Sequence, residues 1–170
     1  MSGQTKTLFE NEWIAVHLRD EWYNYAHMVR GDGVGILIFD SETKKILFRK
    51  EHNPAHGEGV RPTSFTGTIE NGLTPEQTAV LETREESGYT IEESELLPLG
   101  WVYPFKFSDY KQYLFAVNVA GKTPGEIKGD GSIGEKSAST YWGDEDEAVR
   151  INEPLISAML LRLNVKLDLL

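Results

Sequence analysis

The sequence predicts an α/β protein of the α+β kind, an α/β/α sandwich in which helices cover both faces of a mixed β-sheet. Two observations predict this fold class. Short runs of β-branched and aromatic residues occur on both sides of a capped helix in the middle of the chain, and an amphipathic helix pattern ends it. Strands that flank a central helix fit such a sandwich. The 170 residues suffice for one hydrophobic core, so we expect a single domain, 1–170.

The expected strands begin within the first thirty residues, where alternating and aromatic runs predict three of them. A hairpin follows, and further runs come after the central helix. The expected strands are residues 5–9, 12–18, 21–29, 34–39, 46–50, 96–105, 113–119 and 137–142. Two polar, glycine-bearing segments, 51–63 and 121–134, are expected to be loops, and loops of this kind often carry function.

The central helix has start and stop signals. Thr74 is a suitable N-cap, Pro75 suits the first helical position, and Gln77 completes a capping box. Gly88 offers the left-handed conformation that commonly ends a helix.

The end of the chain predicts a short helix and a longer one. The acidic run 144–147 is typical of a helix start, and Asn152 is expected to cap the last helix. Apolar residues at helical spacing form its expected core face: Leu155, Ile156, Met159, Leu160 and Leu163.

Three glutamates, Glu82, Glu85 and Glu86, share one face of the central helix, within an arc of about 100°. Arg84 is expected on the opposite side, where it leaves the charge of this face uncompensated. A solvated acidic face is one interpretation. The other is a site for a hard divalent cation such as Mg²⁺ or Mn²⁺, since these cations prefer oxygen ligands.

The segment from residue 67 to 89, GTIENGLTPEQTAVLETREESGY, resembles the Nudix box, the signature of hydrolases that cleave a nucleoside diphosphate linked to another moiety. The box is degenerate, because Leu73 stands where the family has a glutamate and Leu81 where it has an arginine. We expect these leucines to contact each other in place of an ion pair, an exchange that can be neutral for stability. Thr83 replaces a usual hydrophobic residue. All three helical glutamates are present, so we expect an active box.

The resemblance implies a metal-dependent pyrophosphohydrolase with Mg²⁺ or Mn²⁺ as cofactor. The implied metal ligands are the backbone carbonyl of Thr66 and the carboxylates of Glu82, Glu85 and Glu86. Glu86 is also an implied catalytic residue. A general base must take a proton from the attacking water. The late loop that carries it in a subgroup of the family points to Glu135, with Glu126 and Asp130 as alternatives.

Pro104, fifteen residues beyond Tyr89, bears on the substrate. ADP-ribose pyrophosphatases of the family tend to carry a proline at this distance, so the resemblance favours ADP-ribose, cleaved to AMP and ribose 5-phosphate. His52 stands where that subgroup usually has a phosphate-binding arginine, and Arg61 lies near it in the sequence. Both are candidate substrate-binding residues together with Pro104. The strands within residues 1–30 resemble those that often form a homodimer in the subgroup.

Composition excludes several other classes. A net charge of −10 without a basic stripe argues against a nucleic-acid partner. The absence of cysteine excludes disulfides, a thiol nucleophile and a zinc–thiolate site. No apolar run approaches a membrane span and no signal-peptide core is present, so we expect a cytoplasmic protein without a membrane partner. Aromatic side chains could stack on a nucleobase: Trp22, Tyr23, Trp101, Tyr103 and Phe105.

Two alternatives stay open. The chain could be a Nudix enzyme of other specificity, for a nucleoside triphosphate, a dinucleoside polyphosphate or a nucleotide sugar. It could also be a catalytically impaired Nudix-fold module that binds a nucleotide or a protein. Leu73 and Leu81 favour the module, and the three helical glutamates disfavour it.

Overall fold

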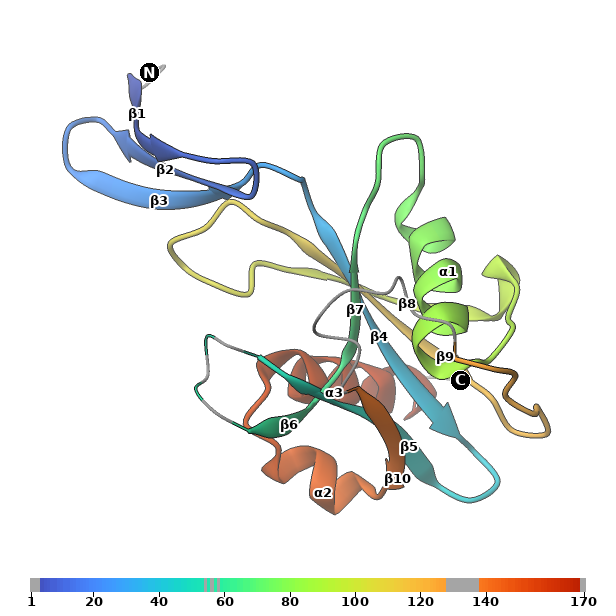
Figure 1. Cartoon of the computed structure of the whole chain (residues 1–170). Helices are drawn as coiled ribbons and strands as arrows, with labels where there is room; N and C mark the ends of the chain where they lie inside the picture. Colours follow the sequence, from blue (N-terminus) through green and yellow to red (C-terminus); the bar gives the residue numbers. More distant parts are fainter. Residues whose placement is uncertain (1–3, 54, 56, 58, 128–137, 169–170) are drawn as a thin grey trace.

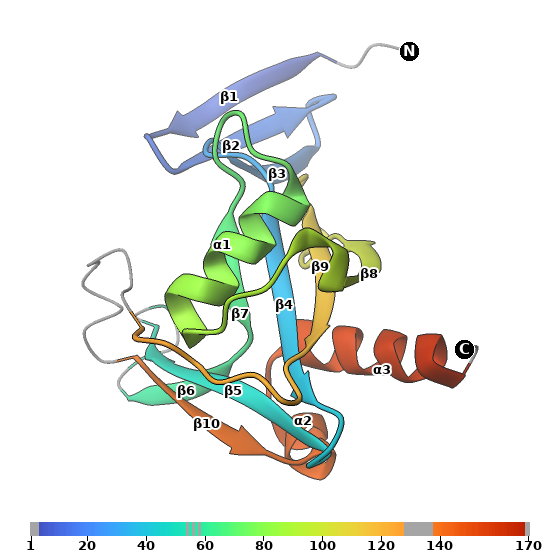
Figure 2. The same cartoon turned by 90° about the vertical axis from the view of Figure 1, so that its right-hand side faces the viewer.

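The computed structural model describes residues 4–53, 55, 57, 59–127 and 138–168. A seven-stranded sheet forms its centre (Figure 1). Helix α1 (Pro75–Ser87) covers one face, and helices α2 (Glu145–Arg150) and α3 (Pro154–Asp168) lie on the other. Figure 2 shows α1 and α3 on opposite sides of strand β4 (Gly33–Asp40). The predicted α/β/α sandwich is confirmed.

The central sheet is mixed, as predicted. Besides β4 its strands are β5 (Lys45–His52), β6 (Val60–Thr63), β7 (Phe65–Thr68), β8 (Leu96–Val102), β9 (Gln112–Asn118) and β10 (Ser139–Gly143). Their order is β10–β5–β4–β9–β8, with β6 beside β5 and β7 beside β4. Strands β4 and β9 run parallel, and the other pairs are antiparallel. A short 3₁₀ helix, Glu93–Glu95, precedes β8.

The sheet divides where β4 and β5 diverge. Strand β5 pairs with β4 over residues 45–47, and beyond this point residues 49–52 pair with β6. Strand β4 pairs with β7 over residues 33–36 instead. Ser64 alone separates β6 from β7, so the chain crosses there from one branch to the other. Strand β7 lies under α1, which brings this division beneath the acidic helix.

The prediction that residues 51–63 form a loop is wrong at both ends. Strand β5 continues to His52, and β6 pairs with it. The pairing arises because β5 extends past its contact with β4, and its open edge accepts another strand. Pro62 is tolerated in β6 because this strand lies at an edge, where the missing N–H interrupts no ladder.

Apolar layers fill both faces of the sheet. The layer under α1 is formed by buried side chains that include Val34, Ile36, Ile38, Phe65 and Ala79. On the other face, all five apolar residues predicted for the core face of the last helix are buried. Burying a side chain of this size stabilises the fold by about 1.5–3 kcal/mol relative to leaving it exposed. The two layers therefore hold α1 and α3 in place against the sheet.

The ends of α1 match the prediction. The N–H of Gln77 donates to Thr74 Oγ1 at 3.1 Å, and Gln77 Oε1 accepts from the N–H of Thr74 at 3.1 Å. Gly88 is left-handed with φ 78°, as a helix end of this kind requires.

At α3 the prediction of Asn152 as the cap is corrected. The carboxylate of Glu153 accepts from the N–H of Leu155 at 3.0 Å and from the N–H of Ile156 at 2.8 Å. Glu153 takes this place because its side chain reaches the first N–H groups of the helix, which have no partner within it. In the described part of the chain, no helix has the length and apolarity to cross a membrane.

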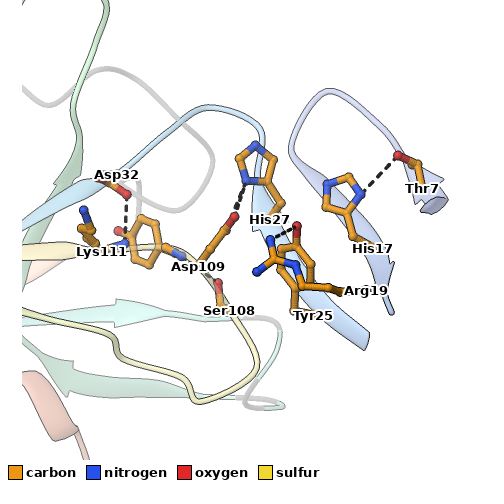
Figure 3. A network of polar contacts seen from close by, with 10 residues as sticks. Thr7, His17, Arg19, Tyr25, His27, Asp32, Ser108, Asp109 and Lys111 are labelled. Carbon is orange, nitrogen blue, oxygen red and sulfur yellow. Dashed lines mark hydrogen bonds and ion pairs between the residues drawn. The ribbon is translucent and has the colours of Figure 1, made fainter. Parts of the chain in front are cut away.

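The first strands form a separate three-stranded antiparallel sheet, ordered β1 (Thr5–Glu10), β2 (Ile14–Arg19) and β3 (Tyr23–Met28). It joins the rest of the molecule through the segment between β8 and β9. Ala26 exchanges main-chain hydrogen bonds with this segment at 2.7 and 3.2 Å. Figure 3 shows the polar contacts around this junction, where His27 Nδ1 lies 3.0 Å from Asp109 Oδ2.

Candidate active site

Of the three glutamates predicted to share a face of α1, two reach the divided part of the sheet. Glu86 and Glu82 contact consecutive residues of β7, namely Thr66 and Gly67. They also influence each other, since the charge of Glu82 raises the pKa of Glu86. The spacing of one helical turn predicted this shared face, and the structure adds the strand that it meets.

Glu86 is held by protein donors on both carboxylate oxygens. The N–H of Thr66 donates to Oε2 at 3.3 Å, and Arg49 forms an ion pair with Oε1. Only 9% of the Glu86 side chain is exposed. The pKa of Glu86 is raised to about 8, chiefly by burial; Arg49 opposes the shift, and the charges of Glu82 and Glu51 add to it.

Arg49 lies at the candidate site, although it was not among the site residues predicted from the sequence. Its side chain is 5% exposed. Its Nε lies 3.0 Å from Glu51 Oε2, and its Nη1 pairs with Glu86 Oε1. A signal for it was present in the sequence. Residues 47, 49 and 51 of a strand share a face, and Leu47 belongs to the core under α1. An arginine that follows Leu47 on that face must find carboxylates there.

Gly67 allows Glu82 to approach the main chain of β7. A Cβ atom at this position would overlap the Glu82 carboxylate, so any side chain would displace it. This is the close approach for which glycine is needed. The first glycine of the box is thus explained by contact with a residue fifteen positions later in the same motif.

Glu85 does not join the pair. Its carboxylate lies 3.8 Å from Arg84 Nη2, and Arg84 therefore compensates part of the charge of α1, contrary to the prediction. Arg84 reaches it because the long side chain bends along the helix surface to its neighbour. In the described residues, no group of three His, Cys, Asp or Glu side chains is placed to hold one metal ion.

Two of the three altered positions of the box lie at the margin of the core. Leu73 and Leu81 are both partly buried, and their mutual contact stays a prediction. Thr83 is fully buried, and its hydroxyl donates to the carbonyl of Ala79 at 2.7 Å. A buried threonine is tolerated here because the preceding turn of the helix satisfies its hydroxyl.

The candidate substrate residues lie at two different cavities. Arg61 lines a cavity of about 530 Å³ together with Glu51, the partner of Arg49. Pro104 lies between two residues that line a second cavity, of about 400 Å³. His52 is exposed, and its Nδ1 lies 3.2 Å from the carbonyl oxygen of Gly59.

The structure describes one of the three candidate bases. Glu135 and Asp130 lie outside the described residues. Glu126 is described and exposed.

Comparison with known proteins identifies the family and the fold. The family model named NUDIX domain matches residues 29–160. A solved structure described as an ADP compounds hydrolase shares the fold with a TM-score of 0.72, over 97% of this chain and 92% of that chain, at 14% identity. No curated protein matches the sequence. Because the family model covers most of the chain, including Glu82, Glu86 and strands β5 and β7, this protein belongs to the NUDIX family.

Proposed function

We propose that the protein is a metal-dependent pyrophosphohydrolase that cleaves ADP-ribose to AMP and ribose 5-phosphate. One observation carries the proposal: two glutamates of α1 converge on β7, and one of them is nearly buried. Carboxylates that face the same strand repel each other, as the effect of Glu82 on the pKa of Glu86 shows, and a cation bound to both would relieve this repulsion. The fold, shared with a protein described as an ADP compounds hydrolase, supports the same substrate class.

The residues fit a hard divalent cation, which the family generally uses. Glu82 and Glu86 offer oxygen ligands only, and their mutual repulsion contributes to the raised pKa of Glu86. Glu82, Glu86 and the carbonyl of Thr66 would hold Mg²⁺ or Mn²⁺. When bound, such an ion withdraws charge from pyrophosphate oxygens and lowers the pKa of a water molecule. Glu85, which is turned toward Arg84, would act through water.

The remaining roles belong to side chains of this chain. The N–H of Thr66 and the guanidinium of Arg49 orient the Glu86 carboxylate. Arg61, at the cavity beside Glu51, would bind a phosphate oxygen. Glu135 would take the proton of the attacking water, whose oxygen forms the new P–O bond as the bridging P–O bond breaks.

The second cavity suits a nucleobase. Tyr23, Tyr25, Tyr103 and Phe105 line it, and aromatic faces favour stacking. Tyr103 and Phe105 belong to the loop between β8 and β9, which also contains Tyr110. The hydroxyl of Tyr110 lies against Gly33. A Cβ atom at Gly33 would meet both the Tyr110 hydroxyl and the carbonyl of Gly67. Tyr110 and Gly33 therefore connect the loop at this cavity to Gly67, which contacts Glu82.

The N-terminal sheet supports extending the proposal to a homodimer. Strand β1 is an edge strand that is exposed along its whole length, and Leu8 and Phe9 lie on it with large exposed areas. An open edge of this kind can pair with a second copy.

The central test is a product assay. The purified protein is expected to hydrolyse ADP-ribose to AMP and ribose 5-phosphate in Mg²⁺ or Mn²⁺, and not in EDTA. Products are identified by mass within a panel of nucleotide sugars, dinucleoside polyphosphates and nucleoside triphosphates. Cleavage of another panel member in preference to ADP-ribose would correct the substrate. No cleavage of any member would overturn the enzyme and favour a binding module.

The base cavity is tested with Tyr103→Ala. Tyr103 is 51% exposed, so its loss should spare the fold. We expect KM for ADP-ribose to rise about 10-fold with little change in kcat, because one stacking contact is lost. Trp13→Ala is the matched control, since Trp13 is also 51% exposed and lies outside the residues that line the cavity. Equal kinetics in both variants would place the base elsewhere.

A further inference from the structure

Arg49 is an unusual neighbour for a cation site. Its guanidinium is almost completely buried and lies against the carboxylates of Glu86 and Glu51. A buried guanidinium persists in a fold only when it is paired. The pairing is made across the division of the sheet, from β5 to α1, so Arg49 also ties the acidic helix to the strand beside it.

The altered box explains why the ion pair between Arg49 and Glu86 matters. Position 81 holds leucine, which brings no charge to α1, and Arg84 is placed at Glu85. The cation that contacts Glu86 therefore comes from another element, β5. Its guanidinium is on the same carboxylate that the proposed function assigns to a divalent cation.

We infer that Arg49 is a built-in competitor for the divalent cation and sets the affinity of the site for it. Both oxygens of Glu86 have protein donors, Thr66 on one and Arg49 on the other. A divalent cation that binds Glu86 must take over part of this coordination, and it meets the repulsion of a buried positive charge. Binding of the cation is coupled to release of Arg49 from Glu86. Arg49 is thus a positioning residue for Glu86, and this role presupposes the proposed metal-dependent function.

The first experiment compares Mn²⁺ binding by calorimetry in the wild type and in Arg49→Gln, without substrate. Removal of the competing charge is expected to tighten Mn²⁺ binding roughly 10-fold or more. The rise in Tm on addition of Mn²⁺ should also be larger in the variant, because its unpaired carboxylates gain more from the cation. Unchanged or weaker binding in the variant, or binding by neither protein, overturns the inference.

Two controls separate charge from general loss of packing. Arg49→Lys keeps the positive charge, so its Mn²⁺ affinity should stay closer to that of the wild type than to that of Arg49→Gln. Arg162→Gln removes an arginine on α3 that donates to the carbonyls of Leu99 and Trp101 at 2.9 and 3.2 Å. It should leave Mn²⁺ affinity unchanged. Tightening in either control counts against competition by the Arg49 charge.

A second measurement follows Arg49 in the wild-type protein itself. In the wild type, the side-chain Nε–H signal of Arg49 is followed by ¹⁵N NMR during a Mg²⁺ titration and assigned by its loss in Arg49→Lys. The signal is expected to shift with the same midpoint as Mg²⁺ binding. A signal that stays fixed while Mg²⁺ binds overturns the inference. These readouts involve no turnover, so a protein that fails to cleave ADP-ribose can still support competition at this site.

Discussion

Glu86→Gln is expected to lower turnover of ADP-ribose by roughly 10²-fold or more. The substitution keeps the size and shape of the side chain and removes the charge that would hold a cation. Loss of such electrostatic stabilisation typically costs this much. Initial rates are measured over a range of Mg²⁺ concentrations, because a lost ligand lowers the rate most when Mg²⁺ is limiting.

The same substitution is expected to weaken the pH dependence of the free energy of unfolding. The pKa of Glu86 lies at about 8 in the fold against an ordinary value of 4.5. The folded protein therefore keeps a proton that the unfolded chain releases, and stability falls as pH rises from about 4.5 to about 8. The glutamine side chain of the variant cannot ionise, so thermal melts in EDTA should show a weaker loss over this window in Glu86→Gln than in the wild type.

Glu85→Gln is the matched control for the site. It removes an equal charge from the adjacent position, but its carboxylate lies beside Arg84 and not at β7. We expect a smaller loss of turnover than in Glu86→Gln, because Glu85 would contact the cation only through water, and an unchanged pH dependence of stability. Near-normal activity of Glu86→Gln at limiting Mg²⁺ would contradict the proposed site. An equal loss of turnover in Glu85→Gln would mean that the net charge of α1, and not the position of Glu86, causes the effect.

Gly67→Ala is expected to lower turnover of ADP-ribose about as much as Glu86→Gln does. The new Cβ would overlap the Glu82 carboxylate, so either that side chain or β7 must move. A displacement of about 1 Å at a catalytic group can cost about 10²-fold in rate. Overpacking of this kind also destabilises a fold by about 1–3 kcal/mol. Turnover and Tm are both measured, because the two losses have one cause.

Gly125→Ala controls for the loss of a glycine. A Cβ atom there would lie 3.5 Å from the carbonyl oxygen of Gly88, an ordinary contact. Turnover and Tm should stay near those of the wild type. If Gly67→Ala is as active as this control, the carboxylate of Glu82 does not need its place against β7.

Features that depend on neighbouring residues were determined by the sequence alone. The capping box of Thr74 and Gln77 and the left-handed Gly88 limit α1 where predicted. The buried face of α3 follows from its apolar spacing. Each of these depends on hydrogen bonds or periodicity within a few residues. The shared face of Glu82 and Glu86 belongs with them, since one helical turn separates the two positions.

Tertiary structure alone decided which charged groups meet. Arg49 and Glu86 are 37 residues apart in the sequence and are joined by the packing of α1 over the divided sheet. Glu85 and Glu86 are adjacent, yet one lies by Arg84 and the other by Arg49. A long charged side chain can reach several oppositely charged groups from its place on a helix or strand. The burial and electrostatic field that choose among them come from elements distant in the chain.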